Sequence, residues 1–460
     1  MSGAILSPRA CRWASDPPPR RIPATLDRSA RSAQLPGMSA DRSTPYSLLG
    51  LAWQALQSHR GWQPAWRSLP APKPRYRVVI VGGGGHGLST AYHLAAEHGI
   101  TDVVVIEQGP IGLGNVGRNT TIIRSNYFSA ENVRFYEASL KLWEGFEQRH
   151  RFNAMVSQRG TLNLFHADGQ RDLFARRANQ MLIEGADCEL LDRAAVKRLA
   201  PLVELDDARF PVLGGFLQRR GGTVRHDAVP WAYARSASAR GVDIVEQCAV
   251  TGIRVEAGRV RGVETSKGTV LADKVVLCVA GHSSTLAAMA GFRLPMETHV
   301  LQAFVTEAVK PCLDVVVTYG AGHFYVSQTD KGGLVFGGPT DGHNSYAQRG
   351  NLPVVEEVLS AGATLMPALK RLRVLRQWGG VMDMSMDGNP IISTTPVDGL
   401  LLNGGWCYGG FKAVPAGGLC TAHLVATGTP HPLAAHFGLA RFREGRTIDE
   451  RGVGPYPWAH

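Results

Sequence analysis

The sequence predicts an α/β protein in which a discontinuous Rossmann-like domain carries an inserted α+β domain dominated by an antiparallel sheet. Residues 75–109, RYRVVIVGGGGHGLSTAYHLAAEHGITDVVVIEQG, have the pattern of a strand, a helix and a second strand. Residues 242–280 and 295–380 show period-two strands broken by glycine turns. A late apolar run, 399–406, and a helical pattern over 412–428 are expected to return the chain to the first unit.

The first unit is the most regular part of the chain. Residues 77–81 and 103–106 are short apolar runs, as expected of buried strands. The helix expected over 86–98 has its apolar residues at helical spacing: Leu88, Ala91, Leu94 and Ala95. Residues 242–280 predict a β-meander, with turns at EAG and SKG and a final buried strand in DKVVLCVAGHSS.

The predicted domains follow from these elements. We expect a disordered extension over 1–45, an N-terminal arm over 46–75 and a C-terminal tail over 431–460. The nucleotide-binding domain is predicted to combine 76–135, 215–290 and 380–430, and the substrate domain 136–214 and 291–379. The first 40 residues loosely resemble a transit peptide, but an extension upstream of a start at Met38 is the preferred interpretation.

Composition excludes several classes of protein. Residues 1–75 hold ten Arg and one Lys against three Asp, so +8 of the net charge of +11 lies there, and no nucleic-acid partner is expected for the folded body. No run approaches the ~20 apolar residues of a membrane span. The seven cysteines lack C-x-x-C spacing, which argues against disulfides and against a metal site. A cytoplasmic location is expected.

A glycine loop follows the first strand. Gly82, Gly84 and Gly87 form G-x-G-x-x-G: the first permits the turn, the second lets the backbone approach pyrophosphate, and the third lets helix and strand pack. Glu107, at the end of the second strand, can accept ribose hydroxyls. The loop predicts a dinucleotide site but does not distinguish FAD from NAD.

The segment after the second strand is more specific. GNVGRNTTIIRSNY (114–127), SQRGTLNL, RRGGTVRHDAV, AGHSS, LRQWGG and GGFK resemble the beta-subunit family of heterotetrameric sarcosine oxidases, among the flavin amine oxidases that include D-amino-acid oxidase. The resemblance covers about residues 45–460. It implies FAD as cofactor, oxidative demethylation of sarcosine to glycine, and alpha, gamma and delta partner subunits.

The resemblance also implies site residues. Gly85, His86 and Glu107 would contact the ADP part of FAD, with Val250 at the adenine. The pyrophosphate and the flavin ring would be contacted by residues of the following loop: Asn115, Arg118, Asn119, Thr120 and Ile122. Arg124 and Lys412 would hold the substrate carboxylate beside Tyr127, and Gly409 would allow close backbone approach. Met382 stands where relatives carry a flavin-linked cysteine, so FAD is expected to be non-covalent. Val335 stands where they carry an oxygen-activating lysine.

His226 admits two interpretations. It is either a structural histidine, with Asp227 capping the next helix, or the residue that carries covalent FMN in the resembling family. The arginines around it, Arg219, Arg220 and Arg225, would suit a phosphate. Electrons would then pass from FAD to FMN and oxygen.

Two other functions remain open. One is a stand-alone FAD-dependent dehydrogenase or oxidase of another secondary amino acid, such as proline or dimethylglycine. The other is a non-catalytic assembly or nucleic-acid-binding protein that uses the basic tail.

Overall fold

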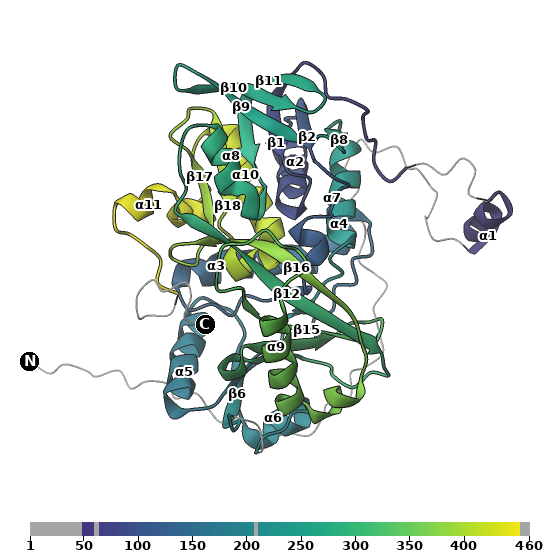
Figure 1. Ribbon diagram of the computed structural model, residues 1–460, viewed down its shortest axis with the longest axis vertical. Helices are drawn as coiled ribbons and strands as arrows, with labels where there is room; N and C mark the ends of the chain where they lie inside the picture. The colour runs from purple at the N-terminus through teal and green to yellow at the C-terminus, as the bar shows by residue number, and fades with distance from the viewer. Residues whose placement is uncertain (1–47, 59–63, 207–209, 451–460) are drawn as a thin grey trace, which may run out of the picture. The chain divides into compact units, whose positions relative to one another are not determined.

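The computed structural model describes residues 48–58, 64–206 and 210–450, and separates into a unit before Trp66 and a larger unit from Trp66 onward (Figure 1). The described part of the smaller unit contains one helix, α1 (Leu48–Leu56), with exposed leucines along it. The extension predicted over 1–45 lies outside the described residues, as do residues 451–460 of the predicted tail. Among the described helices, none has the length and apolar character needed to cross a bilayer.

The first sheet of the larger unit has the order β17-β18-β11-β1-β2-β8. β1 pairs in parallel with both β11 and β2, and β11 also pairs in parallel with β18. β9 and β10 extend β11 as an antiparallel meander, as the sequence predicts. The strands are β1 (Arg75–Val81), β2 (Val103–Ile106), β8 (Asp243–Val245), β9 (Val250–Glu256), β10 (Arg259–Thr265), β11 (Gly268–Leu277), β17 (Ile391–Thr394) and β18 (Leu400–Gly404).

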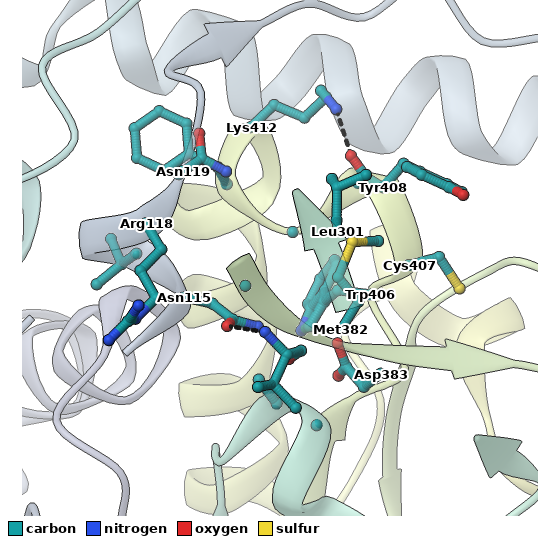
Figure 2. A pocket seen from close by; sticks show the side chains of 18 of the residues that line it. Asn115, Arg118, Asn119, Leu301, Met382, Asp383, Trp406, Cys407, Tyr408 and Lys412 are labelled. Atoms are coloured by element: carbon teal, nitrogen blue, oxygen red, sulfur yellow. Dashed lines mark hydrogen bonds between the residues drawn. The ribbon is translucent and has the colours of Figure 1, made fainter. Parts of the chain in front are cut away.

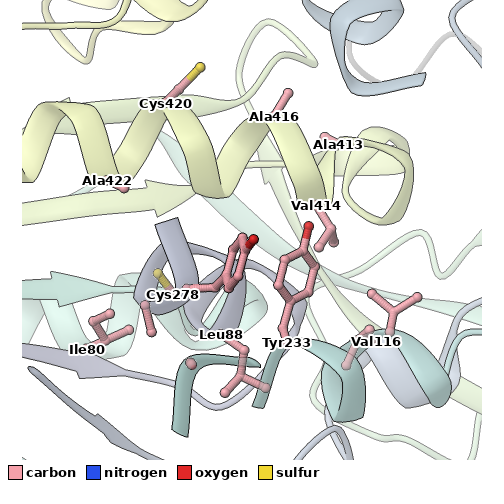
Figure 3. Packing of buried hydrophobic residues seen from close by; sticks show 14 of the residues in the cluster. Ile80, Leu88, Val116, Tyr233, Cys278, Ala413, Val414, Ala416, Cys420 and Ala422 are labelled. Carbon is pink, nitrogen blue, oxygen red and sulfur yellow. The ribbon is translucent and has the colours of Figure 1, made fainter. Parts of the chain in front are cut away.

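Three helices pack beside the parallel strands: α2 (Gly85–His98), α7 (Ala228–Ser238) and α10 (Val414–Thr427). Figure 3 shows Val414 and Ala416 of α10 in the same buried cluster as Ile80 of β1 and Leu88 of α2. Because β18 and α10 come late in the chain, the domain is discontinuous. This part of the predicted fold class is confirmed.

The second sheet has the order β16-β12-β15-β14-β13-β4-β6-β5, and among its described strands only the β13–β4 pair is parallel. The predicted antiparallel insert is therefore confirmed. β6 and the C-terminal half of β16, which the predicted boundaries at 215 and 380 place in the nucleotide domain, pair in this second sheet. The strands are β4 (Thr161–Phe165), β5 (Glu189–Asp192), β6 (Gly214–Gln218), β12 (Met296–Ala308), β13 (Val316–Tyr319), β14 (Phe324–Gln328), β15 (Gly333–Thr340) and β16 (Val374–Ser385).

The other elements connect the two sheets and cover them. β3 (Ile122–Ile123) pairs with β7 (Gly222–Thr223), which joins the loop after β2 to the segment that contains His226. The other α-helices in the described residues are α3 (Ala130–Glu144), α4 (Phe146–His150), α5 (Asp168–Ile183), α6 (Arg193–Leu199), α8 (Ser283–Met289), α9 (Leu352–Leu365) and α11 (Ala440–Arg443). The turn η1 (Asn115–Arg118) faces β16.

Candidate flavin and substrate site

A cavity of about 1120 Å³ runs from the loop between β1 and α2, past η1, to the inner strands of the second sheet. Most of the residues predicted from the sequence line it: Gly82, Gly84, Gly85, His86, Glu107, Asn115, Arg118, Asn119, Thr120, Ile122, Arg124, Tyr127, Val250, Gly409 and Lys412. Gly87, Arg225 and His226 do not line it. Residues far apart in the chain therefore share one cavity.

The three glycines of the loop are used differently. Gly82 has φ +108°, and a Cβ there would lie 2.3 Å from the Cys278 carbonyl oxygen. A Cβ on Gly87 would lie 2.0 Å from the Gly82 carbonyl oxygen, so Gly87 serves the packing of helix on strand. A Cβ on Gly84 would meet nothing within 4 Å, because this residue faces the open cavity. Gly84 thus leaves room for a ligand.

The Glu107 carboxylate is held by backbone amides at the end of β2. It accepts hydrogen bonds from Gly83 N at 2.7 Å and Gly109 N at 3.0 Å. Burial raises the pKa of Glu107, although these backbone donors oppose the shift. Each carboxylate oxygen has a further lone pair for a ligand hydroxyl.

The turn η1 is tied to β16 in the middle of the cavity (Figure 2). The Asn115 side chain donates to the Val381 carbonyl oxygen at 2.5 Å and accepts from Val381 N at 2.9 Å. Trp378 Nε1 donates to the Arg118 carbonyl oxygen at 2.7 Å. These contacts join η1 to the second sheet at the residues for which the sequence predicts contact with the flavin ring.

His86 lies at the first turn of α2, stacked on Trp406 with ring centroids 4.2 Å apart. Its Nε2 is 2.9 Å from the Gly410 carbonyl oxygen. Burial lowers the pKa of His86 to about 3, so the ring is neutral and donates this hydrogen bond. His86 therefore links the glycine loop to the segment that leads to Lys412.

Arg124 and Lys412 reach the same end of the cavity from opposite parts of the chain. Lys412 Nζ donates to the Tyr408 carbonyl oxygen at 2.7 Å (Figure 2), and burial, together with the nearby Arg124 charge, lowers its pKa well below the ordinary value. Arg124 Nη1 donates to Asn126 Oδ1 at 2.5 Å. An arginine and a buried lysine amine side by side favour an anionic ligand group, whose charge would offset the repulsion between them.

Two tyrosines form the wall beside this pair. The rings of Tyr127 and Tyr136 stack with centroids 3.8 Å apart, and the Arg124 guanidinium lies 4.8 Å from the Tyr127 ring centroid. A Cβ on Gly409 would lie 2.0 Å from the Tyr136 hydroxyl, so this position needs glycine for packing. Burial raises the pKa of both tyrosines, which keeps them protonated at neutral pH.

His226 lies behind the cavity wall. Its ring hydrogen-bonds the Gly117 backbone in η1, and the neighbouring Val224 N donates to the Thr121 carbonyl oxygen at 2.9 Å. Burial lowers the pKa of His226. One loop therefore separates this imidazole from the cavity, while the Asp227 side chain accepts from Ala228 N as the cap of α7.

The arginines near His226 are not the open phosphate clamp that the sequence suggests. Each is paired with carboxylates: Arg219 with Glu189, Arg220 with Glu137 and Glu144, and Arg225 with Asp227. Glu137, Glu144 and Glu189 are remote in sequence, so the motif alone could not reveal them. Besides these paired arginines, Lys331 lies near His226, and its positive charge helps to lower the pKa of the imidazole.

Sequence reasoning also missed cavity residues. Asp383 and Glu450 line the cavity, although no pattern in the sequence singles them out. Val335, expected over the flavin, pairs between Val305 and Ser327 inside the second sheet and does not line the cavity. Met382 does line it, as expected, and Figure 2 shows it near Trp406 and Cys407.

Comparison with known proteins identifies the family. A model described as FAD dependent oxidoreductase (DAO) matches residues 77–424. The chain belongs to this family of FAD-dependent oxidoreductases. Three features of the site fit FAD: the open face at Gly84, the Glu107 carboxylate and the length of the cavity. The predicted class of enzyme, a flavin-dependent amine oxidoreductase, is confirmed.

Relatives within the FAD-dependent oxidoreductases agree with the predicted resemblance. The chain is 64% identical to sarcosine oxidase subunit beta of Rhizobium meliloti, over 90% of this chain and 100% of that one. It is 50% identical to the subunit of the same name from Rhodobacter capsulatus, over 88% and 97%. A solved L-proline dehydrogenase from P. horikoshii superposes with a TM-score of 0.75 at 28% identity, over 82% and 99%.

Proposed function

We propose that this chain is the catalytic beta subunit of a sarcosine oxidase, which demethylates sarcosine oxidatively to glycine. The observation that carries the proposal is the meeting of Arg124 and Lys412 at one end of a cavity whose other end is the glycine loop. Bound FAD would accept the hydride from the substrate C–H bond. The similarity to sarcosine oxidase beta subunits supports this substrate over proline or dimethylglycine.

The chain's own residues orient the substrate. Arg124 and Lys412 would hold its carboxylate, and the stacked Tyr127 and Tyr136 would bound the space beside its amine. Because the pKa of Lys412 is lowered, binding a carboxylate next to it favours proton uptake by this amine. Lys412 and Tyr136 are buried, which lowers the exposure of the reacting C–H bond to water.

FAD would be held without a covalent bond. Cys407, next to Met382 in the cavity, has its pKa raised to about 12 by burial, so it is a protonated thiol at neutral pH and a poor nucleophile. The ADP part would lie between Gly84 and Glu107, and the flavin ring near Asn115 and Arg118, as the resemblance implies.

FMN would be carried covalently by His226 and would pass electrons on to oxygen. The contact of His226 with η1 supports this role, since η1 lines the FAD cavity and one loop separates the two positions. The FMN phosphate would need a cationic partner. This could be Lys331, Arg225 once its ion pair with Asp227 is broken, or a cation from a partner chain. The partners would be the alpha, gamma and delta subunits, and a cytoplasmic location stays a prediction.

Mass spectrometry of the co-expressed complex tests this assignment. The peptide that contains His226 should gain the mass of one FMN, and His226→Asn should lose it while sarcosine still bleaches the FAD absorbance. Asp227→Asn serves as a control that changes the neighbouring side chain and keeps the imidazole. An adduct on another residue, or no adduct in the wild-type complex, would return His226 to a structural role and leave the FAD chemistry untouched.

A further inference from the structure

The C-terminal segment reaches the substrate end of the cavity. Residues 446–450, here called the strap, follow α11, and Ile448, Asp449 and Glu450 of the strap line the cavity together with Tyr127 and Tyr136. The strap is therefore part of the wall that surrounds Arg124 and Lys412, in a segment that the sequence predicts only as a C-terminal tail.

A buried ion pair fixes the chain just before the strap. Arg441 donates to Asp387 at 2.7 and 2.8 Å, with side-chain exposures of 4% and 0%. Asp387 Oδ2 also accepts from Ile448 N at 3.1 Å, and Asn389 Nδ2 donates to the Ile448 carbonyl oxygen at 3.2 Å. Asp387 and Asn389 line the cavity too, so the strap is held along its edge.

The Glu450 carboxylate binds the beginning of α3. It accepts from Phe128 N, from Ser129 N at 3.2 Å, from Ser129 Oγ at 3.1 Å and from Asn132 Nδ2 at 2.7 Å. Ser129 is the N-cap of α3, so a carboxylate here also interacts favourably with the helix dipole. One side chain of the strap thus accepts from four donors at the N-terminal end of this helix and in the residues just before it.

These donors adjoin Arg124 and Lys412, here called the substrate clamp because they would hold the substrate carboxylate. Phe128 directly follows Tyr127, and Tyr136 on α3 stacks on that ring, which lies under the Arg124 guanidinium. We propose that Glu450 is a positioning residue: by anchoring the start of α3, it sets the Tyr127–Tyr136 wall and the Arg124 guanidinium for carboxylate binding. The proposal rests on the function proposed above.

The test compares variants of the FAD-loaded full-length protein. Titration with acetate or methylthioacetate is followed by the flavin absorbance, while FAD content and Tm are measured alongside. We expect Glu450→Gln to bind the competitor about tenfold more weakly at unchanged FAD content, because an amide turns a donor toward the backbone N–H groups. Glu450→Asp should recover part of the loss. Asp192→Ala, which removes the cap of α6 outside the cavity, should lower Tm without changing competitor binding.

The outcomes are distinguishable. If Glu450→Gln binds the competitor as tightly as wild type and only its Tm falls, Glu450 is a structural cap and the proposal is wrong. If Glu450→Gln loses FAD, the test uses Ser129→Ala, which keeps the carboxylate but removes one donor to it together with the N-cap of α3. This variant should bind the competitor about two- to threefold more weakly, and equal binding would overturn the proposal. If wild type itself binds no competitor, the proposed substrate clamp fails, and this inference fails with it.

Discussion

Replacing Arg124 with alanine should weaken carboxylate binding and leave FAD bound. Within the described part of the chain, the hydrogen bonds of Arg124 leave from Nη1, to Asn126, so Nε and Nη2 can serve a carboxylate. Losing a charge-assisted hydrogen bond in this half-buried site costs about 1.5–3 kcal/mol, or roughly ten- to 150-fold in affinity. The assay is a flavin absorbance titration with acetate or methylthioacetate, and the KM for sarcosine should rise in parallel.

The control is Arg134→Ala. Arg134 lies on the exposed side of α3, paired with Glu184, so its loss should leave both affinities unchanged. FAD content should match wild type in both variants, since Arg124 is proposed to hold the substrate carboxylate and not the cofactor. An unchanged competitor affinity in Arg124→Ala, at full FAD content, would remove this arginine from the clamp and refute the reasoning.

Two other substitutions test the cavity itself. Gly84→Val should fold but lose bound FAD, because the added side chain enters open space that the pyrophosphate needs. The control is Gly169→Val, where a Cβ is equally unobstructed but lies outside the cavity, and this variant should keep its FAD. Stoichiometric FAD release from denatured Gly84→Val would refute the assignment of the loop. Asp383→Asn tests linkage: burial raises the pKa of Asp383 to about 6 from 3.8, so the folded state holds this proton longer. The contribution of Asp383 to wild-type stability should therefore fall by about 3 kcal/mol as pH rises from 3.8 to 6. The variant should lack that fall in pH-dependent urea unfolding, and identical curves would contradict the buried carboxylate.

The local elements could be predicted closely from the sequence. β2 lies at the predicted residues, and α2 begins one residue before the predicted start, because a buried strand and an amphipathic helix leave periodic signals. Each glycine of the loop meets a different steric requirement, so separate roles for Gly82, Gly84 and Gly87 could be predicted from the sequence. The approach of Arg124 to Lys412 came from the family resemblance, since periodicity does not pair remote segments.

Contacts between remote segments could not be predicted. Glu450 binds α3 from the end of the chain, and Asp383 is a single acid in a strand, so neither produces a pattern. The arginines beside His226 suggested an open phosphate site because their partners, among them Glu189, are distant in sequence. Val335 was misplaced because a shift of one or two residues along a strand changes which side chains face the cavity.

Anaerobic mixing of the FAD-loaded protein with sarcosine tests the central claim most directly. The account predicts that sarcosine bleaches the flavin absorbance and yields glycine, that Arg124→Ala requires much more sarcosine for the same rate, and that His226→Asn still bleaches. Bleaching by proline at concentrations where sarcosine leaves the flavin oxidised would contradict the account and favour a stand-alone dehydrogenase of another secondary amino acid.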